Sequence, residues 1–297
     1  MIKLSPVRAL WASLFITALY PIAGKLAVGG VSPSLLLLFG TAIAVLFYLP
    51  MVTKQKLWPL FFRKDILASF AVIGLFGTAL PFLLIFIALK YTTPSNSAIL
   101  NQVEVIYSLI LTWIFLGERP TGKQLAGTAL VVSGVVLILL NESFTIRWKG
   151  DLIVIFTVWM FQVSHIFVKK LPQGLSTQFM AFGRAVFGFL WSIPLALLLY
   201  YHGEQFVCVI NWKTVCIILY LGLLNYATGN SLWYTAIRNM DLSKATAVIL
   251  SYPVFTYIFS VMLGLDKIHL YQTLGLALAL SGAYLVTNII KKGNVTK

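Results

Sequence analysis

Residues 88–140 decide the fold of this chain and read ALKYTTPSNSAILNQVEVIYSLILTWIFLGERPTGKQLAGTALVVSGVVLILL. The pattern returns without a gap at residues 236–288, 148 positions later. Ten pairs are identical: Ala88/Ala236, Ser95/Ser243, Ile110/Ile258, Gln124/Gln272, Gly127/Gly275, Ala129/Ala277, Leu130/Leu278, Ser133/Ser281, Gly134/Gly282 and Leu137/Leu285. Three further pairs keep the sign of their charge: Lys90/Arg238, Glu118/Asp266 and Arg119/Lys267. We interpret the chain as an internal duplication with halves at residues 1–145 and 146–297.

The composition places the chain in a lipid bilayer. Of its 297 residues, 60% are hydrophobic and 10% are charged, against about 25% charged in soluble domains. A helix needs roughly 20 mostly apolar residues to cross the hydrocarbon core. Ten windows meet this need: residues 9–28, 34–52, 66–88, 95–116, 124–141, 151–169, 176–200, 214–236, 245–264 and 272–290. The sequence therefore predicts an all-α membrane protein with ten transmembrane helices.

The positive charges between the windows predict the orientation. Fifteen Lys and Arg residues fall on the side that holds both chain ends and five on the other, while Lys25 and Arg184 lie inside windows. Because the richer side faces the cytoplasm, we expect both termini on the cytoplasmic side. We expect the membrane to be the inner membrane of a bacterium. Each half has five helices, an odd number, so the second half must enter the membrane upside down. The predicted fold is two inverted five-helix repeats.

The remaining composition argues against several kinds of partner. The formal charge of +14 comes from short basic clusters between apolar runs, which is a topology signal and not a nucleic-acid surface. Cys208 and Cys216 lack metal-binding spacing, and the three histidines lie in separate segments. We expect no metal, cofactor or nucleic acid. The expected partners are the bilayer, a small-molecule substrate and, if transport is coupled, protons.

Several motifs identify the chain with a known family: Leu116-Gly117-Glu118 echoed by Gly264-Leu265-Asp266, the glycine-bearing residues 124–140, Gly150-Asp151-Leu152 and Gly183-Arg184. The pattern resembles the EamA-type family of the drug/metabolite transporter superfamily. The resemblance implies two inverted five-helix repeats that carry small metabolites, often amino acids or related compounds and frequently outward. The family usually has proline in the fourth and ninth helices, whereas here Pro253 has Val105 as its counterpart. The counterpart of Arg184 in the first half is Thr41, so we expect the two halves to work differently.

Small residues on the last helix of each half are expected to pack these helices closely. They are Gly127, Ser133 and Gly134, matched by Gly275, Ser281 and Gly282. Lipid offers no hydrophobic drive for helix association, so small residues allow the close contact that replaces it. We expect these residues to pack and not to bind substrate.

Glu104 is the acid that the windows place deepest in a helix, and intramembrane acids indicate function. The side chains of Ser97, Asn101, Glu104 and Ser108 follow one another at helical spacing and share one face. We expect this face to line a cavity, the alternative being a structural polar contact between helices. Tyr252 is the repeat counterpart of Glu104, so acid and phenol are expected to face one another.

Arg184 lies too deep in its window to reach water and needs a partner. Glu104 is one candidate and a carboxylate on the substrate is the other, while a purely structural ion pair is the alternative to both. Lys25 and His165 align with each other between the halves. Each either lines the cavity or lies at the interface, because both are within a few residues of a window end.

Polar and aromatic residues of the sixth and eighth windows complete the candidate substrate site. They are Trp159 and Gln162 in one window, and Asn225 and Asn230, with Tyr226, Trp233 and Tyr234 nearby, in the other. Their side chains can hydrogen-bond and stack on a small molecule, although membrane aromatics more often serve as core or interfacial belt.

The predicted function is alternating-access export of a small metabolite, an amino acid or related compound. If a proton is coupled, we expect it at Glu104, because apolar neighbours favour the neutral acid and a nearby cation favours the carboxylate. A flippase for a lipid-linked or amphipathic substrate is the alternative within transport. The sequence contains no catalytic motif that would indicate a membrane-embedded enzyme. A scaffold function without transport would leave the duplication unexplained.

Overall fold

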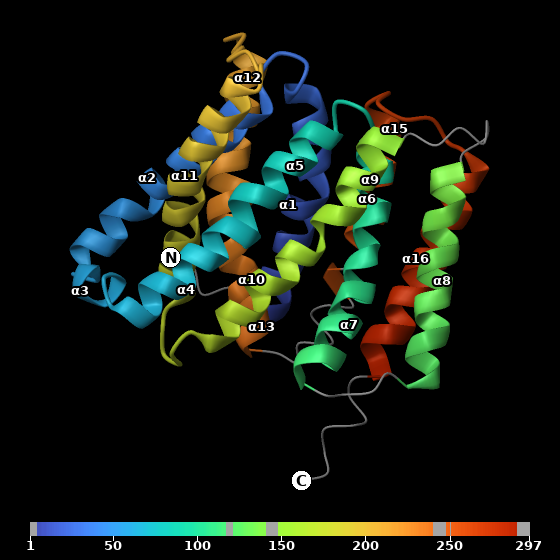
Figure 1. Ribbon diagram of the computed structural model, residues 1–297, viewed down its shortest axis with the longest axis horizontal. Helices are drawn as coiled ribbons and strands as arrows, with labels where there is room; N and C mark the ends of the chain where they lie inside the picture. Colours follow the sequence, from blue (N-terminus) through green and yellow to red (C-terminus); the bar gives the residue numbers. More distant parts are fainter. Residues whose placement is uncertain (1–4, 117–120, 141–147, 240–247, 250, 290–297) are drawn as a thin grey trace.

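The chain is almost entirely helical in the computed structural model, which describes residues 5–116, 121–140, 148–239, 248–249 and 251–289. The helical elements are α1 (Pro6–Ala27), α2 (Pro33–Lys54), α3 (Trp58–Phe61), α4 (Lys64–Gly74), η1 (Leu75–Ala79), α5 (Leu80–Ala88), α6 (Pro94–Leu100), η2 (Asn101–Val103), α7 (Glu104–Leu116), α8 (Gly122–Leu140), α9 (Trp148–Thr157), α10 (Trp159–Lys170), α11 (Thr177–Tyr201), α12 (Trp212–Leu219), η3 (Tyr220–Gly229), α13 (Asn230–Asn239), α15 (Tyr252–Met262) and α16 (Leu270–Ile289). The prediction of an all-α chain is confirmed for these ranges (Figure 1).

Six helical stretches are long and apolar enough to cross a membrane: Pro6–Ala27, Pro33–Lys54, Lys64–Ala88, Lys149–Val168, Thr177–Tyr201 and Trp212–Ala236. Three shorter apolar helices accompany them: Gly122–Leu137, Tyr252–Met262 and Leu270–Leu285. Large apolar side chains such as Leu46, Ile114 and Leu197 are exposed on the outside. Such a surface suits acyl chains, and helices satisfy their own backbone groups in lipid.

The local sequence explains where several helices begin. Pro6 and Pro94 stand in the first turns of α1 and α6, where the missing N–H has no helical partner to lose. The side chains of Ser5 and Thr93, just before them, accept hydrogen bonds from backbone N–H groups of the first turn. Ser176 does the same for α11. Each cap satisfies one of the otherwise orphaned donors of a helix start.

Two of the predicted windows in each half are interrupted at equivalent places. In the third window η1 is π-helical, and the longer π-helical segment η3 occupies the corresponding place in the eighth. In the fourth window the 3₁₀ turn η2 precedes α7 at Glu104, and α15 begins 148 positions later at Tyr252. The starts of α8 and α16 keep the same spacing. Interruptions of this kind frequently occur at functional sites.

These interruptions correct two details of the sequence reading. Glu104 opens α7 and does not lie within one continuous helix. Pro253 lies inside the predicted window 245–264, but in the structure it stands in the first turn of α15, after a turn at Ser251, and so begins a helix.

The helices α8 and α16 pack against each other at one end of the molecule (Figure 1). A Cβ built on Gly134 would lie 2.5 Å from the carbonyl oxygen of Gly275 and 2.9 Å from the backbone nitrogen of Ala279. Reciprocally, a Cβ on Gly282 would lie 2.7 Å from the backbone nitrogen of Val131. Late positions of each helix therefore meet early positions of the other, so α8 and α16 run antiparallel.

The prediction of close glycine packing is confirmed at these positions, but the serine part of it is wrong. Ser133 and Ser281 are exposed and lie away from the contact. The hydroxyl of Ser133 donates to the carbonyl oxygen of Ala129 in its own helix at 2.9 Å. Each serine directly precedes its packing glycine, and neighbouring positions in a helix point about 100° apart.

Two further glycine contacts repeat the same reciprocity. A Cβ on Gly74 in α4 would lie 2.7 Å from the backbone nitrogen of Gly188 in α11. A Cβ on Gly222 in η3 would lie 2.9 Å from the carbonyl oxygen of Gly40 in α2. Each member of the second pair is 148 positions from its counterpart in the first pair. The contacts between halves are thus related like those of a two-fold interface, in which each contact has its mirror.

The reciprocal contacts also change the counterpart of Arg184. A spacing of 148 in the second helix pairs Arg184 with Leu36, not with Thr41 as the sequence reading has it. Thr41 donates to the carbonyl oxygen of Leu37 in its own helix at 2.7 Å. The first half therefore has an apolar residue where the second half has the buried arginine.

The connection after α1 is tied to the connection between α11 and α12. Val31 and Cys208 form an antiparallel bridge, which we call the loop bridge. Two backbone hydrogen bonds flank it: Ser32 N to Val207 O at 2.9 Å, and Val209 N to Gly30 O at 2.8 Å. The loop bridge joins the first half to the second on one side of the molecule.

Candidate functional site

Glu104 faces α10 from the start of α7. Nε2 of Gln162 donates to Oε1 of Glu104 at 2.6 Å, and Nδ1 of His165 lies 3.9 Å from the same oxygen. Gln162 and His165 are three positions apart on one face of α10. The side chains of Glu104 and His165 are 27% and 32% exposed. The structure thus brings together three of the predicted residues, Glu104, Gln162 and His165.

Arg184 is 5% exposed in α11, and neutral groups hold its guanidinium. Nε donates to Oγ1 of Thr78 at 2.8 Å, Nη1 lies 3.5 Å from the hydroxyl of Tyr234, and Nη2 donates to the carbonyl oxygen of Gly77. No carboxylate of the described residues pairs with it. The expected pairing with Glu104 is wrong, because α11 packs on η1 whereas α7 faces α10.

Asn101 and Tyr252 meet directly across the two halves. Nδ2 of Asn101, in η2, donates to the hydroxyl of Tyr252 at the start of α15 at 2.9 Å. The hydroxyl of Tyr20 in α1 is close enough to both side chains to interact with them. Tyr252 is also within electrostatic reach of Glu104. The interrupted helices thus bring the carboxylate and two phenols into one region.

The remaining predicted residues are placed less uniformly. Nδ2 of Asn230 donates to the carbonyl oxygen of Tyr226 in the preceding turn at 2.8 Å, so this amide serves its own helix. Asn225 is buried, and its Nδ2 has no partner among the described residues. The ring of Trp159 packs on Phe76 of η1, with 5.9 Å between centroids.

Lys25 binds backbone carbonyls near the end of α5. Its Nζ donates to the carbonyl oxygens of Leu89 and Thr92 at 2.7 and 2.8 Å. A cation is favourable there, because the carbonyls at a helix end carry partial negative charge. The hydroxyl of Thr92 donates in turn to Oδ1 of the buried Asp151 in α9 at 2.5 Å. Thr92 therefore ties α1, α9 and the connection after α5 together.

Replacing Thr92 by valine is expected to lower the free energy of unfolding by about 2 kcal/mol. The change keeps the shape and the backbone carbonyl but removes a hydrogen bond to a buried charged group. Thr157→Val is the matched control, because the buried hydroxyl of Thr157 bonds to Ile153 O of its own helix. Thermal unfolding in detergent measures both variants, and equal stabilities would contradict a holding role for Thr92.

Some residues that contact the predicted ones were not expected from the sequence. Gly77 and Thr78 hold Arg184, and Ser164 lies beside Gly77. Thr78 is a polar residue at the centre of an apolar window, and this position was the signal that could have identified it as a site residue. Gly77 contributes its backbone oxygen, which no pattern of side chains reveals.

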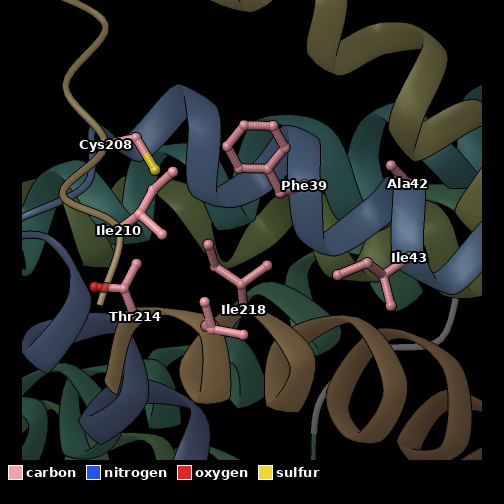
Figure 2. A pocket seen from close by; sticks show the side chains of 8 residues that line it. Phe39, Ala42, Ile43, Cys208, Ile210, Thr214 and Ile218 are labelled. Carbon is pink, nitrogen blue, oxygen red and sulfur yellow. The ribbon is translucent and has the colours of Figure 1, made fainter. Parts of the chain in front are cut away.

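An apolar groove of about 390 Å³ lies elsewhere, between α2 and α12. Figure 2 shows side chains from both helices and from the connection before α12 pointing into it. Phe39, Ala42, Ile43, Cys208, Ile210, Thr214, Val215 and Ile218 line this groove. None of them is a predicted site residue. Ile210 is largely exposed at its rim, so the groove belongs to the outer surface and not to the charged site.

Several known proteins are similar to this chain. An uncharacterized transporter of Archaeoglobus fulgidus is 27% identical over 73% of this chain and 75% of its own length. A probable amino-acid metabolite efflux pump of Escherichia coli is 23% identical over 69% of this chain and 71% of its own. The uncharacterized inner membrane transporter YhbE of Escherichia coli is 28% identical over 72% and 67%. A solved crystal structure shares the fold, with a TM-score of 0.65, 16% identity and 96% of both chains covered.

The family assignment rests on a match to nearly the whole chain. The sequence model of the EamA-like transporter family matches residues 7–140 and again residues 148–288. This places the chain among transporters and not among enzymes, as the sequence predicts. The chain belongs to the EamA-like transporter family of membrane proteins.

Proposed function

We propose that this chain is a carrier that moves a small metabolite across the membrane by alternating access. Its two inverted five-helix repeats correspond to residues 1–145 and 146–297 and together make ten transmembrane helices. The antiparallel packing of α8 on α16 and the reciprocal glycine contacts support inversion. In such a fold the halves rock about a central site at their interface.

One observation carries the proposal: each half holds a charged side chain whose partners include residues of the other half. Glu104 of the first half binds Gln162 and lies beside His165 of the second. Arg184 of the second half binds Gly77 and Thr78 of the first. Relative movement of the halves must rearrange both sets of contacts, which links the polar centre to the transport cycle.

We infer an amino acid or related compound as the substrate and export as the direction. The relative named as a probable amino-acid metabolite efflux pump supports both. The location is the bacterial inner membrane, supported by the relative named as an inner membrane transporter. The Lys and Arg asymmetry of the connections supports cytoplasmic termini. Counterflow of labelled amino acids in proteoliposomes tests the proposal, and its failure for every amino acid would contradict it.

No observation on the described residues supports the alternative function, a flippase. A flippase needs a lateral path from the bilayer to a polar site for the headgroup. The groove between α2 and α12 belongs to the outer surface, but its lining is apolar and includes neither Glu104 nor Arg184. The polar site between the halves supports a soluble metabolite instead.

Replacing Glu104 by glutamine is expected to remove the pH dependence of transport. Glu104 is the proposed proton site, and the titratable groups that face it are His165 and Tyr252. Glutamine keeps a hydrogen-bond acceptor for Gln162 but cannot exchange a proton. Initial rates in proteoliposomes across a pH series measure the effect. Asp65→Asn, at an exposed pair with Arg63, is the control, and unchanged rate and pH profile in Glu104→Gln would rule out the proton role.

A further inference from the structure

We propose that Arg184, Ser164 and Tyr226 form an oxyanion site that binds the carboxylate of the transported substrate. The inference rests on the proposed carrier function and assigns the residues that hold the carboxylate of its substrate. It gives a specific role to Ser164 and Tyr226, whose hydroxyls have no hydrogen-bond partner in the described part of the chain.

Arg184 has donors to spare for a carboxylate. A guanidinium carries five N–H groups, and the described contacts use one on each of its three nitrogens. One N–H remains on each terminal nitrogen. Arginine favours bidentate binding of a carboxylate through two of its N–H groups. A buried cation held by neutral groups is costly until such an anion arrives.

Ser164 places a hydroxyl beside the guanidinium. The residue is 1% exposed, and its Oγ has no partner among the residues that the structure describes. A Cβ built on Gly77 would clash with Oγ of Ser164 and would lie 3.4 Å from Cζ of Arg184. The hydroxyl and the guanidinium therefore both border the Cβ position of Gly77. Glycine at position 77 allows Ser164 to approach this closely.

Tyr226 supplies the second hydroxyl. It is 1% exposed in η3, and within the described ranges its hydroxyl has no partner. Arg184 is close enough to act on it electrostatically. Tyr226 stands 148 positions after Thr78, which binds Arg184 directly. Thr78 and Tyr226 therefore occupy equivalent positions of the two π-helical segments.

The charge balance favours a carboxylate over a phosphate. One guanidinium neutralises one carboxylate, and two neutral hydroxyls complete the hydrogen bonds. A phosphate monoester carries about −1.5 to −2 charges at neutral pH. Lys25 is engaged with the carbonyl oxygens of Leu89 and Thr92, so a second charge would lack a ready counter-ion. The site therefore fits a singly charged acid.

The test is ligand-induced thermal stabilisation of the full-length chain in detergent. The probes are each standard L-amino acid, its carboxamide and inorganic phosphate. We expect at least one amino acid to raise the unfolding temperature, and its carboxamide and phosphate not to. Ser164→Ala and Tyr226→Phe should weaken this binding about tenfold or more, because each removes a hydrogen bond to a charged group.

Matched variants separate binding from folding. Without ligand, Ser164→Ala should be at least as stable as the parent, since it removes a buried hydroxyl that lacks a partner. Ser192→Ala, also in a buried position, is the control, because the hydroxyl of Ser192 bonds to Phe189 O of its own helix. Arg184→Lys keeps the charge but loses the bidentate fork and should bind weakly even if Arg184→Gln does not fold.

Several outcomes would overturn the oxyanion site. They are equal stabilisation by acid and carboxamide, stabilisation by phosphate alone, no stabilisation by any amino acid, or unchanged affinity in Ser164→Ala and Tyr226→Phe. The last result would mean that the hydroxyls bind only water. If parent and variants show equal counterflow of an amine without a carboxylate, the carrier function would stand and the oxyanion site would be rejected. Absence of any counterflow would reject the carrier itself.

Discussion

Oxidation of the Val31→Cys variant is expected to stop transport, and reduction is expected to restore it. Position 31 pairs with the natural Cys208 in the loop bridge, and the flanking backbone hydrogen bonds make this a non-hydrogen-bonded pair. Such pairs have Cα atoms about 4.5 Å apart, within the range of about 4.4–6.8 Å that disulfides span. The bond would lock together connections of the two halves that have to separate in the proposed alternating-access cycle.

The control combines Val31→Cys with Cys208→Ser. It keeps the new thiol and the exposed Cys216 but cannot close the disulfide. Counterflow in proteoliposomes is measured with an oxidant and after a reductant, and mass spectrometry follows the cross-link. Undiminished transport by a fully cross-linked protein would show that the loop bridge stays closed throughout the cycle.

Replacing Gly134 by leucine is expected to lower the free energy of unfolding by about 3 kcal/mol. Even a Cβ at this position would lie 2.5 Å from the carbonyl oxygen of Gly275, and a backbone atom cannot rotate away as a side chain can. The helices must separate and lose the van der Waals contacts that join them in lipid. Thermal unfolding in detergent measures the loss, and Gly282→Leu should show a similar one because its contact is reciprocal.

Ser133→Leu is the matched control for both variants. Ser133 directly precedes Gly134 in the same helix, but it is exposed and faces away from α16. The same leucine side chain is expected to change stability little there. Equal losses at positions 133 and 134 would mean that leucine perturbs α8 itself and not its packing on α16.

The candidate site was predictable in its residue types but not in its pairings. Glu104 and Arg184 were expected to meet because they are lone charges in apolar windows. In the structure they bind different neighbours: Gln162 beside His165 for the acid, and Gly77 with Thr78 for the arginine. Which side chains pair depends on which helices pack together. An apolar sequence is compatible with many packings of its helices, so it does not determine the pairs.

Helix irregularity accounts for most of the other differences. A face of Ser97, Asn101, Glu104 and Ser108 was expected from the period of a continuous α-helix, but η2 intervenes at Asn101–Val103. Asn101 consequently binds Tyr252, while Glu104 binds Gln162. The side chain of Ser108 lies outside the described residues. A 3₁₀ or π-helical turn rotates every later side chain, and hydrophobic periodicity does not reveal it.

The sequence by itself determined the all-helical membrane class, the transporter family and the duplication from which we infer inversion. These conclusions follow from the composition, from the 148-residue spacing and from the charges between windows. All three features can be found in the sequence without knowing how the helices pack. Only the tertiary structure decided which polar groups meet: Glu104 with His165, Arg184 with the carbonyl of Gly77, and Ser164 beside that arginine. Such contacts join residues far apart in the chain, and the rotation and close approach of whole helices set them.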